Sequence, residues 1–162
     1  MNEALFSSSR DDWETPPDFF AALNEEFRFT LDVCALPETA KCAAYFTPED
    51  DGLSRPWIAP RGGAVFCTPP YSRRTKDSPG QEAWIKKAAE EGQRPGAVVV
   101  MLIPARTDTL AFHKYIYHKA EIRFIKGRLR FRVNGKPGDA APFPSMVVIF
   151  RGPETKEKEE NT

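Results

Sequence analysis

The amino-acid sequence predicts a single domain of the α/β class, in which strands and helices alternate along the chain. Ala97 to Ile103 is an unbroken apolar run rich in β-branched residues, which is typical of a central strand covered on both faces. Helix-start and turn signals separate this run from other short apolar runs, which indicates alternating strands and helices. The 162 residues, 41% of them hydrophobic, suffice for one buried core. In such sheets, ligands bind beyond the carboxyl ends of the strands.

The first predicted helix begins within Thr15-Pro16-Pro17-Asp18. We expect Thr15 to accept a hydrogen bond as the N-cap residue, and Pro16 to occupy the first turn, where a missing N–H has no cost. An apolar stripe follows at helical spacing, formed by Phe19, Phe20, Leu23 and Phe27. The alternating segment from Phe27 to Leu31 predicts the first strand, which runs on to Asp32.

The remaining elements follow from apolar runs and their stop signals. We expect strands at Ala64 to Cys67, 97–103, Ile122 to Ile125, Leu129 to Val133 and Met146 to Phe150, and helices at Gln81 to Glu91 and 107–118. Gly92 closes the helix before it, and Asn134-Gly135 predicts a turn. Because strand ends mark the ligand-binding edge, this order selects Asp32, 68–71 and 104–108 as candidate site positions.

The ends of the chain and its few cysteines narrow the class of protein. Residues 1–12 predict a flexible lead-in, 13–152 the folded domain and 153–162 a charged flexible tail. No run approaches the roughly 18 apolar residues of a membrane span and the start lacks signal-peptide order, so we expect a cytoplasmic protein with no membrane partner. The irregular spacing of Cys34, Cys42 and Cys67 argues against a disulfide framework. With only two histidines, we expect no metal site.

The net charge of zero hides an uneven distribution of charge. Residues 1–54 carry twelve acidic and three basic side chains, whereas 55–76 and 122–138 carry five and six basic side chains and no acidic one. The two basic segments are either solvated loop and strand faces or a binding surface for a polyanion. Charge alone favours the first interpretation, and the second needs the support of a site.

The segment Thr68-Pro69-Pro70-Tyr71 follows a predicted buried strand and carries the main chemical signal. Two prolines fix the backbone and lack N–H donors, so the Pro69 carbonyl can stay free as an aimed acceptor. The Thr68 oxygen and that carbonyl suit the amino group of a flat ring, on which Tyr71 can stack. The alternative is a proline-rich strand stop followed by a packing tyrosine.

In this segment the sequence resembles the amino-methylating DNA methyltransferases, whose signature is Asn, Asp or Ser, then Pro-Pro, then Tyr, Phe or Trp. Across 13–150 the order of motifs is similar to that of the phage-type DNA N-6-adenine methyltransferases. The matching segments are Trp13-Glu14-Thr15-Pro16, Leu31-Asp32-Val33-Cys34-Ala35, Asp50-Asp51-Gly52-Leu53, Pro69-Pro70-Tyr71-Ser72, Pro104 to Thr109, Gly127-Arg128 and Pro142-Phe143-Pro144-Ser145. Several motifs in one order make the resemblance specific, whereas each alone is weak.

The resemblance implies a minimal Rossmann-like methyltransferase fold with a mixed sheet, S-adenosylmethionine as cofactor and double-stranded DNA as substrate. It implies methyl transfer to the N6 amino group of an adenine flipped out of the duplex, in the cytoplasm of a bacterial host. The implied catalytic residues are Thr68, Pro69, Pro70 and Tyr71. The implied cofactor-binding residues are Trp13, Thr15, Pro16, Asp32 and Asp51. DNA contacts are expected from Arg73, Arg74, Lys76, Arg106 and Arg128.

For four of these residues, a purely structural role is the alternative to the binding role. Trp13 either shelters the cofactor or fastens the first helix, and Asp51 either binds the cofactor or forms an acidic turn before Gly52. Arg106 either meets DNA or pairs with Asp108. Arg128 either meets DNA or lies on the solvent face of a strand.

Two departures from the family pattern leave alternative functions open. Residues 35–38 stand where the usual pattern has a Gly-x-Gly turn, and Thr68 replaces the more usual Asn or Asp. Ser at that place is familiar among cytosine-N4 methyltransferases, so cytosine-N4 methylation is one alternative. The other is a catalytically inactive methyltransferase fold that binds DNA or a partner protein.

Overall fold

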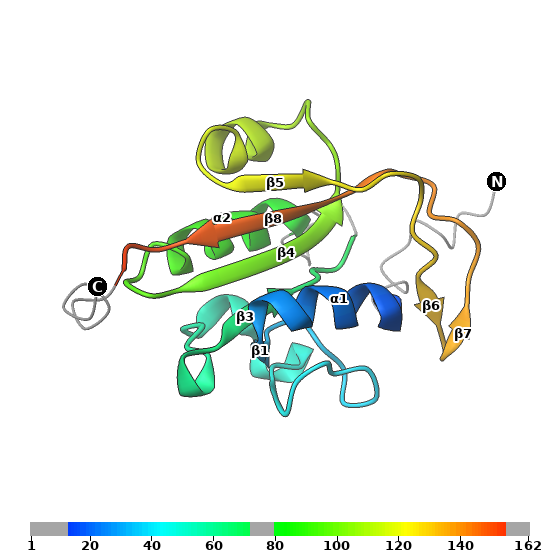
Figure 1. The fold of residues 1–162 in the computed structure, drawn as a ribbon, viewed down its shortest axis with the longest axis horizontal. Helices are drawn as coiled ribbons and strands as arrows, with labels where there is room; N and C mark the ends of the chain where they lie inside the picture. Colours follow the sequence, from blue (N-terminus) through cyan, green and yellow to red (C-terminus); the bar gives the residue numbers. More distant parts are fainter. Residues whose placement is uncertain (1–12, 72–79, 155–162) are drawn as a thin grey trace.

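The computed structural model describes residues 13–71 and 80–154 of the chain. Residues 1–12 and 155–162 lie outside this part, as do the predicted DNA-binding residues Arg73, Arg74 and Lys76. Within the described part, a six-stranded mixed sheet carries helices on both faces and stands beside a two-stranded hairpin (Figure 1). The predicted α/β class with a mixed sheet is thereby confirmed.

Four parallel strands and two further strands form the sheet, in the order β2-β1-β3-β4-β8-β5. The parallel strands are β1 (Phe29–Asp32), β2 (Ala44–Tyr45), β3 (Ala64–Cys67) and β4 (Val98–Pro104). Strand β8 (Ser145–Arg151) runs antiparallel between β4 and β5 (Glu121–Phe124). The last of these strands in the sequence therefore occupies an interior position, and the carboxyl ends of the parallel strands share one edge.

Different helices cover the two faces of the sheet (Figure 1). They are α1 (Pro17–Phe27), α2 (Gly80–Glu91) and a π-helix (Phe112–Ile116). Leu23 of α1 joins a buried cluster with Phe66 on one face, and Ile85 of α2 joins a second cluster with Met101 on the other. Side chains of β4 alternate between the two clusters, as the continuous apolar run predicts for a central strand.

Shorter elements connect the strands and flank the sheet. Three 3₁₀-helices, at Pro48–Asp50, Gly52–Ser54 and Pro60–Gly62, lie between β2 and β3. A hairpin of β6 (Arg132–Val133) and β7 (Lys136–Pro137) projects beside the start of α1 (Figure 1). Its turn is formed by Asn134 and Gly135, whose positive φ angles of 54° and 76° suit a tight hairpin turn. The predicted turn is confirmed.

The structure corrects the predicted cap of the first helix and the predicted start of the first strand. Pro16 is the N-cap residue and no side chain caps α1, so Thr15 does not have the predicted capping role. Arg28 follows the helix with a left-handed backbone, φ 61°, so the strand begins only at Phe29. Asn24 accounts for the boundary between helix and strand. Its Oδ1 accepts the Phe29 N–H at 2.9 Å, so this N–H is bonded to a side chain and the helix does not continue.

Two later elements are shorter than predicted, and strands β2 and β7 and the three 3₁₀-helices were not predicted. The expected helix 107–118 is reduced because Thr109 Oγ1 accepts the Phe112 N–H at 3.2 Å, so that the helical residues begin after Thr109. The expected strand Leu129 to Val133 forms only within β6. Edge strand β2 has two residues, which is too few for any periodicity to be read from the sequence.

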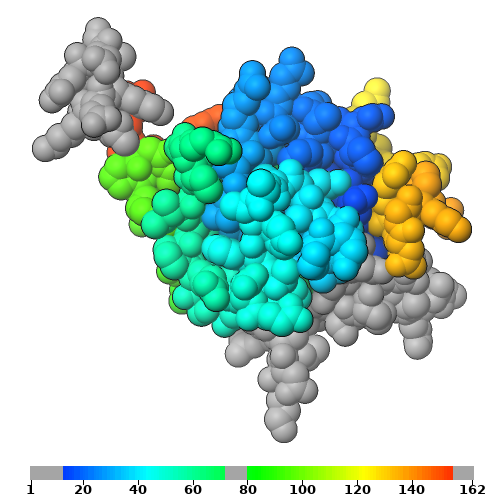
Figure 2. All heavy atoms as spheres, turned by 90° about the horizontal axis from the view of Figure 1, so that it is seen from below, coloured from blue at the N-terminus to red at the C-terminus, as the bar shows by residue number. Residues whose placement is uncertain are grey.

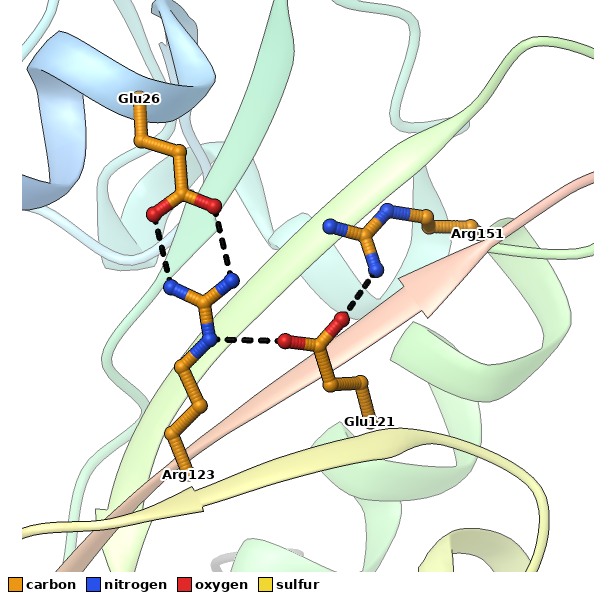
Figure 3. A network of polar contacts seen from close by, with 4 residues as sticks. All are labelled: Glu26, Glu121, Arg123 and Arg151. Atoms are coloured by element: carbon orange, nitrogen blue, oxygen red, sulfur yellow. Dashed lines mark hydrogen bonds and ion pairs between the residues drawn. The ribbon is translucent and has the colours of Figure 1, made fainter.

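A surface network of ion pairs ties α1 to the edge strand β5 (Figure 3). Arg123 of β5 donates to both carboxylate oxygens of Glu26 in α1, each at 2.7 Å. Glu121 of β5 accepts from Arg123 and from Arg151 of β8. These hydrogen bonds lower the pKa of Glu26 and of Glu121 and raise that of Arg123. Both guanidinium groups also lie over the Phe27 ring, so the network covers the end of α1.

We expect Arg123→Met to lower the melting temperature by a few degrees at low salt, because it removes the bidentate contact between α1 and β5. The loss should shrink in about 1 M NaCl, where the screening length falls to about 3 Å. Thermal denaturation followed by circular dichroism measures both effects. Arg130→Met is the matched control, because Arg130 is exposed and outside the network. The same loss at both salt concentrations would contradict an ion-pair role.

Candidate active site

The three predicted site segments lie together at the carboxyl edge of the parallel strands. β1 ends at Asp32, which is in register with Phe66 of β3, and β3 leads directly into Thr68. The neighbouring strand β4 ends at Pro104. Two narrow hollows and one larger cavity are found at this edge. The positions that the strand-end rule selected are thus close together in space, and their role as the active site stays a prediction.

The first hollow, which we call the Asp32 hollow, brings three predicted cofactor residues together with a predicted catalytic one. Its walls are Trp13, Glu14, Thr15, Asp32, Cys34, Leu36, Thr39, Lys41, Phe66 and Thr68. Its volume is about 20 Å³, which is room for about one water molecule. A larger ligand therefore requires the walls to move apart.

A backbone bridge to the hairpin positions one wall of the Asp32 hollow. The Glu14 N–H donates to the Arg132 carbonyl at 2.8 Å, and the Arg132 N–H donates to the Glu14 carbonyl at 2.9 Å. Figure 2 shows the dark blue start of the described chain beside the orange hairpin of β6 and β7. A segment distant in sequence thus holds Trp13 and Thr15 over the sheet edge.

Asp32 is a buried carboxylate, with only 2% of the residue exposed. Its two oxygens accept the backbone N–H groups of Cys34 at 3.3 Å and of Lys41 at 3.0 Å. Burial raises the pKa of Asp32 from 3.8 to about 6, and the two hydrogen bonds offset only part of that rise. Because the folded pKa lies above the unfolded one, ionisation of Asp32 costs folding stability as the pH rises from 3.8 through about 6. A cation bound beside Asp32 would offset this cost.

Lys41 brings a positive charge to the same hollow. Its ammonium group pairs with Glu14 at 3.4 Å and lies 5.8 Å from the centroid of the Phe20 ring. The Asp32 hollow therefore offers charges of both signs, which suits a ligand that itself carries both. Glu14 belongs to one of the motifs that carry the family resemblance, whereas no signal in the sequence singled out Lys41. Their pairing depends on how the loop after β1 folds back.

The second hollow, which we call the Tyr71 hollow, is lined by Trp13, Thr15, Thr68, Pro69, Pro70, Tyr71 and Phe131 and holds about 10 Å³. The Tyr71 hydroxyl donates to the Leu102 carbonyl of β4 at 2.9 Å. Burial raises the pKa of Tyr71 well above its usual range, so this hydroxyl stays protonated. The Tyr71 ring stands edge-on, at centroid distances of 6.1, 5.7 and 5.4 Å, to the rings of Trp13, Phe131 and Phe143.

This geometry gives Tyr71 the packing role that was the alternative interpretation of its motif. Stacking of Tyr71 on a base stays a prediction. The aromatic cluster also contains two residues, Phe131 and Phe143, that sequence reasoning did not assign to the site. Phe143 belongs to one of the motifs that carry the family resemblance, so a signal for it existed, whereas Phe131 lies in a segment predicted only as a strand.

A larger cavity of about 400 Å³ lies beyond the end of β4. Tyr71 lines it on the side of the second hollow, and Glu82 of α2, Arg106 and Asp108 supply its charged walls. Arg106 is exposed, and no ion pair joins it to Asp108 in the part of the chain that the structure describes. The alternative of an Arg106–Asp108 pair is therefore not found, and the DNA contact of Arg106 stays a prediction.

Three predicted residues are among the described walls of neither hollow nor of the larger cavity. Pro16 is adjacent to Thr15, at the N-cap of α1. Asp51 stands between two 3₁₀-helices in a left-handed turn, φ 53°, which matches the acidic-turn alternative. Arg128 lies in a loop, where it donates to the Ala141 carbonyl at 3.2 Å, so its expected alternative as part of a strand face is wrong. The DNA contact of Arg128 stays a prediction.

Within 13–71 and 80–154, no group of three or more His, Cys, Asp or Glu side chains is arranged to hold a metal ion. None of the helices in these ranges has the length and apolar character needed to cross a membrane. Burial raises the pKa of the Cys67 thiol well above its usual range and that of Cys42 to about 12, so neither is a ready thiolate.

Comparison with known proteins assigns the chain to a family. The DNA N-6-adenine-methyltransferase of Haemophilus phage HP1 (strain HP1c1) is 28% identical over 148 residues, which are 88% of this chain and 80% of that protein. The DNA N-6-adenine-methyltransferase of Escherichia phage T1 is 30% identical over 127 residues, which are 78% of this chain but only 49% of that protein. The protein YfdM of Escherichia coli (strain K12), provisionally named a methyltransferase, is 43% identical over 65 residues, 38% of this chain and 71% of that protein. Residues 3–160 match the family described as DNA N-6-adenine-methyltransferase (Dam), and the chain therefore belongs to that family.

Proposed function

We propose that this chain transfers the methyl group of S-adenosylmethionine to the N6 amino group of an adenine that is flipped out of double-stranded DNA. Its family gives the class of activity, which is adenine-specific DNA methylation. One observation carries the finer proposal: Trp13, Thr15 and Asp32 line the same hollow as Thr68. Residues expected to hold the methyl donor thus adjoin a residue expected to hold the methyl acceptor.

The sheet supports a Rossmann-like methyltransferase domain, to which we assign residues 13–152. Its four parallel strands carry the candidate residues at their carboxyl ends, and a strand of opposite direction, β8, stands next to β4. Such open sheets bind their ligands beyond those carboxyl ends. The phage origin of two relatives supports action on DNA in the cytoplasm of a bacterial host.

The residues of the Asp32 hollow fit S-adenosylmethionine by their chemistry. The ionised Asp32 carboxylate suits the ammonium group of the amino-acid end, and Thr15, 3% exposed, adds a hydroxyl to the same wall. The hollow is narrower than this ligand, so its walls must open on binding. When bound, the cofactor supplies an electrophilic methyl group on a sulfonium sulfur.

Thr68 and Pro69 are suited to orient the amino group that receives the methyl. An exocyclic amine is a poor nucleophile because its lone pair is delocalised into the ring. Hydrogen bonds from its N–H groups to the Thr68 oxygen and the Pro69 carbonyl favour positive charge on nitrogen during the transfer and aim the lone pair at the methyl carbon. Pro70 keeps this backbone stiff and has no N–H with which to compete. As the N–C bond forms, the S–C bond breaks and the sulfur is left as a neutral thioether, and the extra proton on nitrogen then passes to water.

The aromatic cluster supports base flipping. A flipped base loses its stacking in the duplex, and aromatic side chains at the pocket offset part of that loss. Tyr71 follows the two prolines and lines both the Tyr71 hollow and the larger cavity. In the free protein its ring is packed against neighbouring rings, so entry of a base requires the cluster to rearrange.

The larger cavity supports an approach of DNA from the end of β4. Arg106 is exposed at this cavity, where it can meet a phosphate. We assign Arg73, Arg74, Lys76 and Arg128 to the same DNA contact because the first three follow the Thr68 to Tyr71 motif directly and the fourth lies in a basic segment.

We expect Thr68→Ala to lower the rate of methylation about 100-fold, because one acceptor for the developing charge is lost. Tyr71→Ala should also lower the rate. Tyr71→Phe should lower it less, because the ring for stacking is kept and only its hydrogen bond to the Leu102 carbonyl is lost. Mass spectrometry of nucleosides from the methylated DNA measures the product. Thr30→Ala is the matched control, because the Thr30 hydroxyl bonds to the Pro60 carbonyl, away from the hollows.

The same assay tests the alternatives. N4-methylcytosine as the sole product would replace the adenine assignment by cytosine-N4 methylation. No product from the wild-type protein, with cofactor and DNA both bound, would favour the inactive binding fold. Full activity of Thr68→Ala would remove Thr68 from the mechanism.

We expect binding of S-adenosylmethionine to release protons from Asp32 at pH 6, and to release almost none at pH 8. At pH 6 about half of the Asp32 carboxyls are protonated, and a neighbouring ammonium group lowers their pKa. Calorimetric titration in two buffers with different ionisation enthalpies counts these protons. Below pH 6 the affinity should fall towards about tenfold per pH unit. Proton release that persists in Asp32→Asn would assign the titration to another group.

We expect Arg106→Ala to weaken DNA binding and to reduce the slope of log K against log salt by about one, as loss of one phosphate contact does. Cofactor affinity should not change. Fluorescence anisotropy with labelled duplex DNA over a range of salt concentrations measures the slope. Arg61→Ala is the matched control, because Arg61 is exposed but precedes β3 at the opposite end of that strand. Equal slopes for the wild type and Arg106→Ala would exclude this contact.

A further inference from the structure

The indole N–H of Trp13 has no hydrogen-bond partner in the described part of the chain, although the nitrogen is buried. Trp57 shows the usual arrangement, because its indole N–H donates to the Gly52 carbonyl at 2.8 Å. A buried donor without an acceptor is costly and therefore rare in folded proteins, where it calls for a specific explanation. A ligand that brings an acceptor to Trp13 is one such explanation.

The surroundings of Trp13 limit how it can find an acceptor elsewhere. Its ring stacks on Phe131 at a centroid distance of 5.4 Å and on Phe143 at 6.1 Å. The next residue, Glu14, is fixed by the two backbone hydrogen bonds to Arg132. Ring and backbone are thus both held, and the side chain lines both the Asp32 hollow and the Tyr71 hollow.

The chemistry of the donor narrows the choice of ligand group. An indole N–H can only donate, so it cannot serve the ammonium group of the cofactor or the amino group of a base. A carboxylate is the strongest acceptor on S-adenosylmethionine, and a hydrogen bond to it is charge-assisted. In the Asp32 hollow, Asp32 attracts the ammonium group, which leaves the carboxylate of the same amino-acid end for neighbouring donors such as Trp13.

We propose that Trp13 binds the cofactor by donating its indole N–H to the carboxylate of the amino-acid end. This inference rests on the proposed function and adds to it a residue that recognises one group of the cofactor. Trp13 then forms a hydrogen bond to the cofactor in addition to lining the Asp32 hollow. The aromatic stacking on Phe131 and Phe143 then serves to aim the N–H.

The test is calorimetric titration of the wild type and Trp13→Phe with two ligands. One is S-adenosylhomocysteine, and the other is its decarboxylated analogue, which keeps the ammonium group. Phenylalanine retains an aromatic ring but has no N–H. We expect Trp13→Phe to lower the affinity for S-adenosylhomocysteine about tenfold or more, as loss of a charge-assisted hydrogen bond does. The affinity for the decarboxylated analogue should not change.

Trp84→Phe is the matched control, because Trp84 stacks on Trp57 and is not among the described walls of either hollow. A second readout uses the folded wild type alone: the indole ¹H–¹⁵N signal of Trp13 should move downfield with S-adenosylhomocysteine and not with the decarboxylated analogue. This measurement keeps the proposal testable if Trp13→Phe does not fold.

Three outcomes would overturn the inference. If Trp13→Phe lowers the affinity for both ligands equally, Trp13 contributes only contact surface to the hollow and no hydrogen bond to the carboxylate. Unchanged affinity for both would exclude the hydrogen bond, and a loss confined to DNA binding would assign the N–H to the base. If the wild type binds neither ligand, the cofactor assignment of the proposed function fails, which is a different result from any of these.

Discussion

The antiparallel ladder between β4 and β8 is the contact on which the geometry of the site depends. It pairs seven residues of each strand, from Val98 with Arg151 to Pro104 with Ser145, and nearly all of them are buried. β3 pairs with β4 only as far as Met101, so the last residues of β4 rely on β8 for their support. The Leu102 carbonyl, which accepts the Tyr71 hydroxyl, lies in this stretch. The ladder thereby fixes both the end of β4 and the ring that follows the two prolines.

How much the sequence predicts depends on whether a feature is local. Buried strands such as β3 and β4 are continuous apolar runs that the sequence reveals. The strand-end rule singled out Asp32 at the end of β1 and Thr68 after β3, and the two residues line one hollow. The pairing of Lys41 with Glu14 and the packing of Phe131 on Trp13 join segments far apart in the chain, so no window of sequence reveals them. The predicted N-cap residue of α1 was wrong for a local reason: Pro16 occupies the N-cap position, at which threonine is common, and Thr15 lies one residue before it.

The candidate site concentrates groups that weaken the free protein. Asp32 is ionised at neutral pH only against the effect of its burial, and the Trp13 donor has no acceptor among the described residues. Both residues line hollows with room for little more than a water molecule. Natural proteins accept such local costs mainly where a ligand repays them, which is why conflicts of this kind indicate functional positions. The central strands β3 and β4, by contrast, have apolar side chains on both faces, and elsewhere in the sheet the buried hydroxyl of Ser145 in β8 also has no partner in the described part.

The interior position of β8 also affects the order in which the chain folds. β5 precedes β8 in the sequence yet pairs only with it, so β5 has no strand to join until β8 is present. During synthesis, the edge of β4 that β8 covers stays open while the residues between them emerge from the ribosome. An unpaired apolar edge of this kind invites association with other chains. Completion of the sheet is therefore a late event that depends on contacts distant in sequence, and the nascent protein is most exposed to aggregation just before its final strand is made.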